Sequence, residues 1–434
     1  MAAMGKEQRD VLIVGGGVIG LACAWYLLRA GRQVTLLERA ELGAGASHGN
    51  CGTITPSHAP PLSEPGVIRQ AIRWMLKPDA PLYIRPRFDP GLWRWLWAFK
   101  ARCNVRDHAM ATAVRAGLLN ASNTALEKLL AETGIDCEHC HAGLLYVFRD
   151  PRNWEAYASL PDRLRPIGIR AEGWDGTRME REEPALKTGV AGGIWFPDDA
   201  SLRPDRLVAG LGRVVREAGG EILENAPVEA FERRAGHIES VRAGGRRWQA
   251  REVVLAAGAW SPLLSRQMGF RLPVQPGKGY SLTFARPALA PRRSLVLKEP
   301  SVCVTTWTEG FRLGSTMEFS GYDTALNPVR LAALRRGAAA FLHEPGRGEP
   351  LEQWCGWRPM SPDVLPIIGR APGLDNLIVA TGHGMLGVSM AAITGILVRD
   401  LLLGRPPVLD LEPVSPARFR RGTGASVEAV ASQA

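Results

Sequence analysis

Residues 10–31, DVLIVGGGVIGLACAWYLLRAG, decide the fold of this 434-residue chain. The first five form the short apolar run, rich in β-branched residues, that is typical of a buried parallel strand. Residues 15–20 match G-x-G-x-x-G, and the apolar residues after them have helical spacing as far as Gly31. The three glycines of this pattern permit a sharp turn, the approach of the backbone to a pyrophosphate and close packing of helix on strand. The residues expected along a cofactor here are Gly15, Gly16, Gly17, Val18, Ile19 and Gly20.

A second apolar run, residues 33–37, ends in Glu38. An acidic residue at this place accepts hydrogen bonds from the ribose hydroxyls of a dinucleotide. Glu38 disfavours a cofactor with a 2′-phosphate, although the adjacent Arg39 weakens that argument slightly. The unit therefore predicts FAD or NAD and does not distinguish between them.

Two later segments repeat the change from strand to small-residue turn. Residues 250–260 form one, after a hairpin-like alternating pattern over 226–249 that turns at Gly236. Residues 376–380 form the other, followed by the loop TGHGMLG at 381–387 and an apolar helical pattern. We expect two helix N-termini to converge on one extended cofactor with two anionic regions.

Taken together, these segments resemble the D-amino-acid dehydrogenase family of the FAD-dependent D-amino-acid oxidase superfamily. The resemblance covers nearly the whole chain. The stretches that carry it are VLIVGGGVIGLACAWYLLRAG (11–31), GASHGNCGTITPSHAPPLSEPGV (45–67), KPDAPLYIRPRFDPGLWRWLW (77–97), VVLAAGAWSPLL (253–264), PGKGYSLTF (276–284), GWRPMSPDVLPIIGR (356–370) and GHGMLGVSMA (382–391).

The resemblance implies FAD, bound non-covalently, and an α/β fold, α+β overall. A discontinuous Rossmann-like FAD-binding domain would comprise 8–60, 198–268 and 352–415. A substrate domain with a mixed or antiparallel sheet and helices would comprise 61–197 and 269–351, and 416–434 would be a disordered tail. The further cofactor residues that the resemblance implies are Ser47, Asn50, Gly52, Val228, Ala257, Gly258, Trp260, Gly382, His383, Gly384, Met385, Leu386 and Gly387. A locally hydrogen-bonded loop histidine is the alternative for His383.

The same resemblance assigns Arg358, in the segment GWRP, to the substrate carboxylate. A guanidinium suits this role because it forms two parallel charged hydrogen bonds and fixes the carboxylate plane. The alternative is a structural arginine paired with Asp363. Tyr280 could donate a second bond to the carboxylate or be a half-buried core tyrosine. His58 could shape the substrate pocket or be an exposed loop histidine.

The implied reaction is dehydrogenation of a D-amino acid by hydride transfer from its α-carbon to flavin N5, which leaves an imino acid. No general base is needed if the amine is bound neutral. No acidic residue is evidently placed for a cationic side chain, so D-proline, cis-4-hydroxy-D-proline and small apolar D-amino acids are the favoured substrates. The alternatives are a glycine or sarcosine oxidase that uses oxygen directly, and a basic flavoprotein that binds nucleic acid.

Charge and cysteine content set further expectations. Lys and Arg number 53 against 43 Asp and Glu, a net charge of +10 that suits anionic partners. Seven cysteines form no disulfide framework, so we expect a cytoplasmic protein. The Cys137–Cys140 spacing lacks the further ligands of a metal site, and no metal is expected. The tryptophan- and arginine-rich stretch 93–102 is either a helix of the substrate domain or a peripheral membrane contact, which would suit a quinone as electron acceptor.

Overall fold

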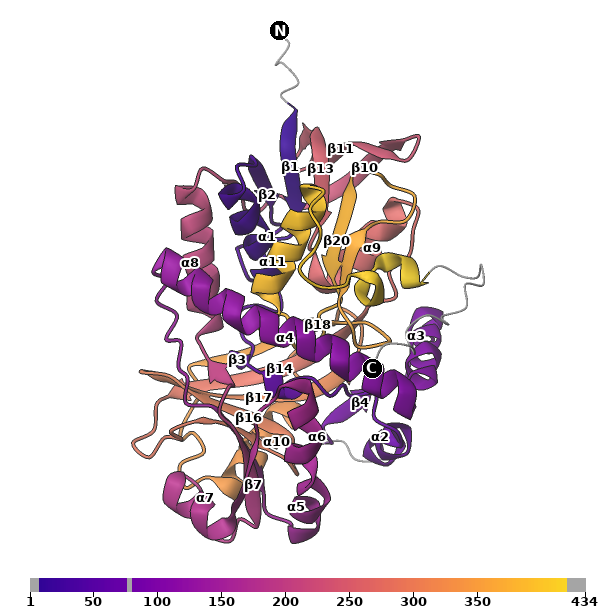
Figure 1. The fold of residues 1–434 in the computed structure, drawn as a ribbon. Coiled ribbons are helices and arrows are strands. Elements are labelled where there is room, and N and C mark those ends of the chain that lie inside the picture. The colour runs from indigo at the N-terminus through magenta and orange to yellow at the C-terminus, as the bar shows by residue number, and fades with distance from the viewer. Residues whose placement is uncertain (1–7, 76–79, 420–434) are drawn as a thin grey trace.

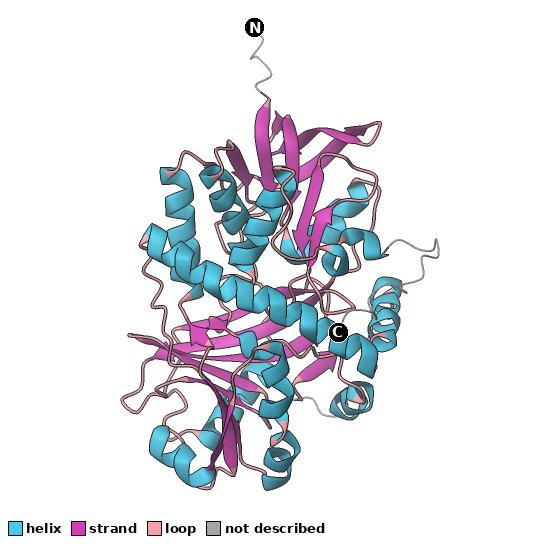
Figure 2. Ribbon diagram, viewed as in Figure 1, coloured by secondary structure: helices cyan, strands magenta, loops and turns pink. Residues whose placement is uncertain are grey.

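The computed structural model describes residues 8–75 and 80–419. Two large sheets lie one above the other, and the long helix α4 (Val105–Thr133) crosses between them (Figure 1). Coloured by secondary structure, the strands fall into an upper and a lower group around that helix (Figure 2). The predicted mixture of an α/β unit and a second, largely antiparallel unit is confirmed.

The upper sheet has six strands in the order β19-β20-β13-β1-β2-β9. All neighbours pair in parallel except β19 and β20, which are antiparallel. Helices α1, α8 and α11 pack beside it. The bounds are β1 (Arg9–Val14), α1 (Val18–Arg29), β2 (Val34–Leu37), α8 (Pro204–Glu217), β9 (Glu221–Leu223), β13 (Ala250–Leu255), β19 (Ile367–Arg370), β20 (Leu377–Thr381) and α11 (Ala391–Leu402). The strand–turn–helix–strand unit predicted from residues 10–37 is therefore confirmed.

The lower sheet has nine strands, in the order β18-β14-β17-β16-β15-β5-β7-β6 with β4 added beside β17. Most of its pairs are antiparallel. Its bounds are β4 (Leu82–Ile84), β5 (Leu144–Phe148), β6 (Glu172–Asp175), β7 (Gly192–Phe196), β14 (Gln275–Ala285), β15 (Ser294–Leu297), β16 (Val302–Thr306), β17 (Gly310–Phe319) and β18 (Glu352–Met360).

Two small sheets and several helices complete the described residues. The hairpin predicted around Gly236 is confirmed as β10 and β11. The small-sheet bounds are β3 (Thr53–Ile54), β8 (Ala200–Ser201), β10 (Val228–Arg234), β11 (His237–Ala243) and β12 (Arg246–Trp248). The remaining helices are α2 (Val67–Met75), α3 (Pro90–Ala101), α5 (Pro151–Tyr157), α6 (Leu160–Leu164), α7 (Gly176–Glu182), α9 (Ser261–Gln267) and α10 (Pro328–Phe341), with 3₁₀ turns η1 (Pro56–His58), η2 (Arg165–Ile167), η3 (Gly258–Trp260), η4 (Glu412–Val414) and η5 (Pro416–Phe419). No helix of residues 8–75 and 80–419 is both long and apolar enough to cross a bilayer.

Two of the expected boundaries are wrong. The segment 352–415 begins with β18, which pairs with β14 along nine residue pairs and so belongs to the lower sheet. Residues 416–419 are not a disordered tail, because they form η5 and the Arg418 guanidinium donates to the Asp363 carboxylate at 2.8 Å. The rest of the predicted tail, 420–434, lies outside the described residues.

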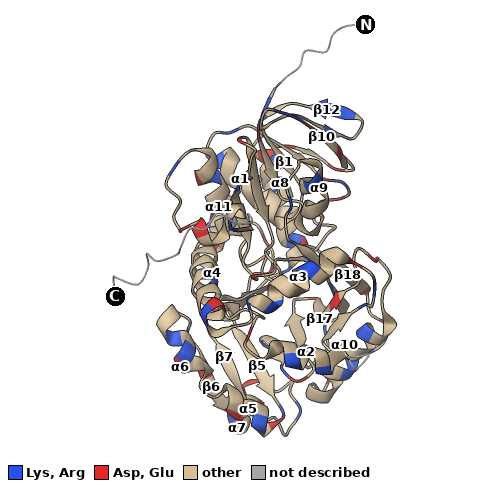
Figure 3. Ribbon diagram, turned by 90° about the vertical axis from the view of Figure 1, so that its right-hand side faces the viewer, with Lys and Arg blue, Asp and Glu red and all other residues tan. Residues whose placement is uncertain are grey.

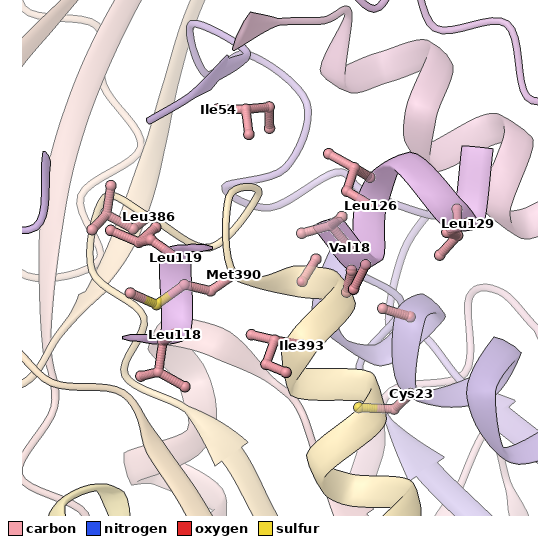
Figure 4. Packing of buried hydrophobic residues seen from close by; sticks show 14 of the residues in the cluster. Val18, Cys23, Ile54, Leu118, Leu119, Leu126, Leu129, Leu386, Met390 and Ile393 are labelled. Carbon is pink, nitrogen blue, oxygen red and sulfur yellow. The ribbon is translucent and has the colours of Figure 1, made fainter. Parts of the chain in front are cut away.

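Helix α4 joins the two units through one apolar core. Leu118, Leu119 and Leu126 of α4 are buried in the same cluster as Met390 and Ile393 at the start of α11 (Figure 4). The Ser122 hydroxyl, also on α4, accepts a hydrogen bond from the Ile393 backbone N–H at 3.3 Å. The core beneath the cofactor helices is therefore built partly from the segment predicted to be the substrate domain.

Candidate active site

The turn between β1 and α1 brings the backbone of its glycines against the backbone that follows β13. Gly15 has φ +113°, and a Cβ there would lie 2.5 Å from the carbonyl oxygen of Ala256 at the end of β13. A Cβ at Gly20 would collide with the carbonyl oxygen of Gly15. Only glycine allows this approach, so the start of α1 stays close to the ends of β1 and β13.

Two predicted side chains hold this turn. The Glu38 carboxylate accepts from the Gly16 N–H at 2.7 Å, and the Ser47 hydroxyl accepts from the Val18 N–H at 3.1 Å. The first backbone N–H groups of a helix carry partial positive charge and attract anions.

A cavity of about 1390 Å³ extends from this turn to the lower sheet. Small-molecule sites usually enclose about 300–1,000 Å³, so this space is large enough for an extended cofactor together with a substrate. Of the predicted site residues, Gly16, Gly20 and Gly382 do not line it. Those that do are Gly15, Gly17, Val18, Ile19, Glu38, Arg39, Ser47, Asn50, Gly52, His58, Val228, Ala257, Gly258, Trp260, Tyr280, Arg358, His383, Gly384, Met385, Leu386 and Gly387.

The late glycine loop differs from expectation in where its helix begins. Helix α11 starts only at Ala391, and turns occupy the residues between it and Gly387. Loop backbone, rather than the first turn of that helix, therefore faces the cavity. The His383 Nε2 lies 2.9 Å from the Thr394 hydroxyl, and the histidine is 5% exposed. Burial lowers the pKa of His383 to about 3, so the ring is neutral near pH 7.

Arg358 projects from β18 over the face of the lower sheet. A Cβ at Gly279 of β14 would collide with its guanidinium, so the glycine provides the space that the arginine occupies. Its Nη1 donates to the Thr316 carbonyl at 2.6 Å, where Thr316 has φ +61°. This left-handed conformation is strained for a β-branched residue, and such strain is concentrated at functional sites.

No described residue pairs its carboxylate with Arg358. The Asp363 carboxylate, considered as a structural partner from the sequence, binds Arg418 instead. Burial lowers the pKa of Arg358, and the charges that oppose this effect are those of the Cys51 and Cys303 thiols, with no carboxylate among the causes. The cavity therefore contains a buried guanidinium whose remaining N–H groups can bind an anionic ligand.

Tyr280 is placed differently from the substrate-binding alternative. It is 1% exposed, and its hydroxyl donates to the Glu318 carboxylate at 2.9 Å. Successive side chains of a strand point to opposite faces, so Tyr280 points away from the face on which Gly279 meets Arg358. The contact of its hydroxyl with Glu318 favours the core-tyrosine alternative over a bond to a substrate carboxylate, although other atoms of Tyr280 line the cavity.

His58 is not an exposed loop residue. It ends the η1 turn, lines the cavity and lies edge-on to the Tyr146 ring with centroids 5.8 Å apart. The Arg115 guanidinium donates to its carbonyl at 2.6 Å. Burial, together with the charges of Lys298 and Arg115, lowers the pKa of His58 to about 3.

The sequence patterns do not single out four further residues that line the cavity: Cys51, Tyr146, Lys298 and Cys303. Tyr146 lies inside the wholly apolar run LLYVF, which does not reveal which face meets a cavity. Lys298 is a charged residue immediately after a short apolar strand, which is a weak signal. A hydrogen bond with the Cys303 thiol, together with the guanidinium charges of Arg312 and Arg358, lowers the pKa of Cys51.

The Cys137–Cys140 segment lies outside the cavity lining. Cys137 is buried, Cys140 is exposed, and both are free thiols. Within the described ranges no group of three or more His, Cys, Asp or Glu side chains could hold a metal ion.

The residues around the cavity fit FAD. The glycine turn leaves room for a pyrophosphate beside the amides of α1, and Glu38 lies at the end of β2 where a ribose would be bound. The Arg39 guanidinium covers the Trp260 ring at 3.7 Å, which gives the cavity a flat aromatic wall. The family model described as "FAD dependent oxidoreductase" (DAO) matches residues 10–401. The chain belongs to this family.

Members of the DAO family with curated descriptions match along nearly the whole chain. A D-amino acid dehydrogenase from Paramagnetospirillum magneticum is 35% identical over 417 residues, which cover 94% of this chain and 98% of that protein. A D-amino acid dehydrogenase from Xanthobacter autotrophicus is 35% identical over 416 residues, with 94% and 99% coverage. The chain is thus an FAD-dependent oxidoreductase.

Solved structures share the DAO-family fold. Glycine oxidase from Geobacillus kaustophilus has a TM-score of 0.77 at 24% identity, covering 96% of this chain and all of that one. L-proline dehydrogenase from P. horikoshii has a TM-score of 0.72 at 18% identity, covering 96% and 98%. At these identities the likeness concerns the fold alone.

The buried His383 predicts a pH-dependent stability. The unfolded chain takes up a proton on His383 below about pH 6.5, whereas the folded protein does so only near pH 3. The free energy of unfolding should therefore fall as the pH is lowered from 6.5 towards 3. His383→Gln should reduce this slope by about 1 kcal/mol per pH unit, measured by urea unfolding of the FAD-bound protein at pH 7, 6, 5 and 4.

His343→Gln is the matched control, because His343 is exposed. That variant should keep the slope of the unmodified protein. An identical slope in His383→Gln and the unmodified protein would show that His383 does not remain neutral in the fold.

Proposed function

We propose that the protein dehydrogenates D-amino acids, with D-proline and cis-4-hydroxy-D-proline as favoured substrates. The observation that carries this proposal is the buried Arg358 guanidinium, which faces the cavity without a carboxylate partner among the described residues. The substrate class is supported by the names of the relatives that match most of the chain.

In this proposal Arg358 binds the substrate carboxylate and fixes the position of the α-carbon. Its hydrogen bond to the Thr316 carbonyl holds one edge of the guanidinium, so the other N–H groups are already oriented before substrate arrives. When bound, non-covalent FAD accepts the hydride that leaves the α-carbon, and an imino acid is produced. The lone pair of a neutral substrate amine assists this departure, so no described side chain has to remove a proton from carbon.

Cations outnumber carboxylates at the substrate end of the cavity, where Glu64 and Glu299 are the acidic lining residues. Arg115, Lys298 and Arg358 are cations in or beside the substrate end of the cavity. A cationic side chain such as that of D-arginine would be repelled by these three cations, an effect that Glu64 and Glu299 offset only in part. Small cyclic amino acids avoid this cost.

A screen under anaerobic conditions tests the function. The FAD-bound protein is mixed with D- and L-forms of proline, alanine and arginine and with cis-4-hydroxy-D-proline, and the loss of flavin colour is followed. We expect the D-forms to bleach the flavin, fastest with the two cyclic substrates. Fastest bleaching by D-arginine, or bleaching by L-forms only, would contradict the proposal.

The same preparation distinguishes a dehydrogenase from an oxidase that uses oxygen. With a quinone analogue present in air, we expect quinone reduction to exceed hydrogen peroxide formation. The reverse would favour the glycine or sarcosine oxidase alternative.

Arg358→Ala should raise the KM for D-proline and lower kcat/KM by at least about 100-fold, because each charged hydrogen bond contributes about 1.5–3 kcal/mol. FAD should remain bound, as judged from the visible spectrum. Arg358→Lys keeps the charge but cannot form two parallel hydrogen bonds to the carboxylate. Its kcat/KM should therefore lie between those of Arg358→Ala and the unmodified protein. Unchanged kinetics in Arg358→Ala would remove this residue from substrate binding.

We further propose that the protein is cytoplasmic, contacts a membrane through α2 and α3, and passes electrons to a quinone there. Helix α2 has no buried residue, and on α3 Trp93 and Trp97 are 54% and 66% exposed, whereas Trp95 is buried. Basic residues accompany these side chains on both helices (Figure 3). The cavity lining includes residues of both helices, so a lipid-soluble acceptor would have a short route to the cofactor.

Sedimentation with lipid vesicles tests this contact. The protein should bind vesicles containing phosphatidylglycerol better than vesicles of phosphatidylcholine, because basic residues near a surface attract anionic lipid. Replacing Trp93 and Trp97 together by Ser should reduce the bound fraction at least about fivefold, since the aromatic rings would no longer enter the interface. Leu351→Ser, at an exposed apolar residue elsewhere, is the control. Equal binding by both variants would contradict the proposed surface.

A further inference from the structure

Lys298 lies on the cavity face of the lower sheet, beyond the end of β15. Leu297, the residue before it, pairs with Val302 of β16, and Val302 pairs with Ser315 of β17. Thr316, whose carbonyl binds Arg358, follows Ser315. The Arg358 guanidinium and the backbone of Lys298 are therefore near one row across the sheet. Two strand spacings separate the backbone of Lys298 from that of β17 by about 10 Å.

The Lys298 ammonium is held by aromatic rings rather than by an acid. It lies 4.4 Å from the centroid of Tyr146 and 4.7 Å from that of Tyr157. Within residues 8–75 and 80–419 it forms no ion pair or hydrogen bond. A lysine that contacts only ring faces still has N–H groups that can donate to a ligand.

Two acidic residues, Glu64 and Glu299, also line the cavity, but neither forms an ion pair with the Lys298 ammonium. Glu299 Oε1 accepts from the backbone N–H groups of Arg149 and Asp150, at 3.2 and 3.1 Å, which directs it to the start of α5. The charges of Glu64, on an exposed loop, and of Glu299 both raise the pKa of Lys298. Burial has the larger effect and lowers the pKa of Lys298 to about 8, so the side chain is still mainly cationic at neutral pH.

We propose that Lys298 determines substrate specificity by donating a hydrogen bond to an oxygen at the end of the substrate remote from its α-carboxylate. The inference rests on the proposed function, since it takes Arg358 as the site of that carboxylate. The substrates that Lys298 would favour share an oxygen that accepts a hydrogen bond, either in a ring hydroxyl or in a side-chain carboxylate. An uncharged hydrocarbon at the same place would leave the ammonium unsatisfied, so the oxygenated substrate is preferred.

Two matched substrate pairs test this inference in the FAD-bound protein. One pair is cis-4-hydroxy-D-proline and D-proline, and the other is D-glutamate and D-norvaline. In each pair the ratio of kcat/KM for the oxygenated to the unoxygenated member is measured. Lys298→Met should lower the ratio at least tenfold in one pair, and that pair identifies the oxygen as hydroxyl or carboxylate. Lys298→Arg, which keeps a cationic donor, should restore most of the ratio.

The control is Lys128→Met, on the exposed side of α4, which should leave both ratios unchanged. Unchanged ratios in Lys298→Met for both pairs would overturn the inference while leaving the proposed function intact. Absence of flavin reduction by any D-amino acid would instead contradict the proposed function. In that case the role of Lys298 is tested by the binding of glutarate and valerate, which is followed through the visible flavin spectrum. Lys298→Met should weaken the binding of glutarate relative to that of valerate at least tenfold. Equal weakening for the two ligands would overturn the role of Lys298.

Discussion

The contact between the start of α1 and the turn before it determines how the upper sheet can meet a cofactor. The carbonyl of Gly15 occupies the space in which any side chain at Gly20 would begin, and Gly15 itself lies against the end of β13. Three chain segments are thereby brought to one point, with the amides of the helix directed outward from it. Glu38 and Ser47 then satisfy the nearest N–H groups without closing the space in front of them. The rest of the cavity is built around this arrangement.

At the opposite end of the cavity the lower sheet contributes a charged side chain, whereas the upper sheet contributes backbone N–H groups. Arg358 crosses above Gly279 and is fixed by the carbonyl of a strained Thr316. A buried guanidinium without an acidic neighbour has a large desolvation cost. Such a residue is retained where a ligand supplies the missing charge, which is consistent with recognition of an amino acid.

The sequence predicted local elements well because their signals are local. The glycine pattern of residues 15–20, the hairpin turn at Gly236 and the strand before Gly382 all formed as expected. The sequence was less informative where the position of a residue depends on pairing between strands that are distant in the chain. Strand β18 joins the lower sheet through its register with β14, and no signal within 352–360 specifies that partner. The two alternatives for Tyr280 stayed open in the sequence for the same reason: alternation shows that neighbouring residues face opposite ways, but not which face meets the cavity. Lys298 acquires its place from the pairing of β15 and β16, which the sequence alone does not show.

Helix α4 has a consequence for how the molecule can be divided. Its leucines complete the core beneath α11, although its sequence lies between the strands of the other unit. A shortened chain containing only the six-stranded sheet and its own helices would expose that apolar surface to water and be prone to aggregate. The protein should thus unfold as one cooperative unit. Neither half should be stable as an independent domain unless helix α4 is included with the upper sheet.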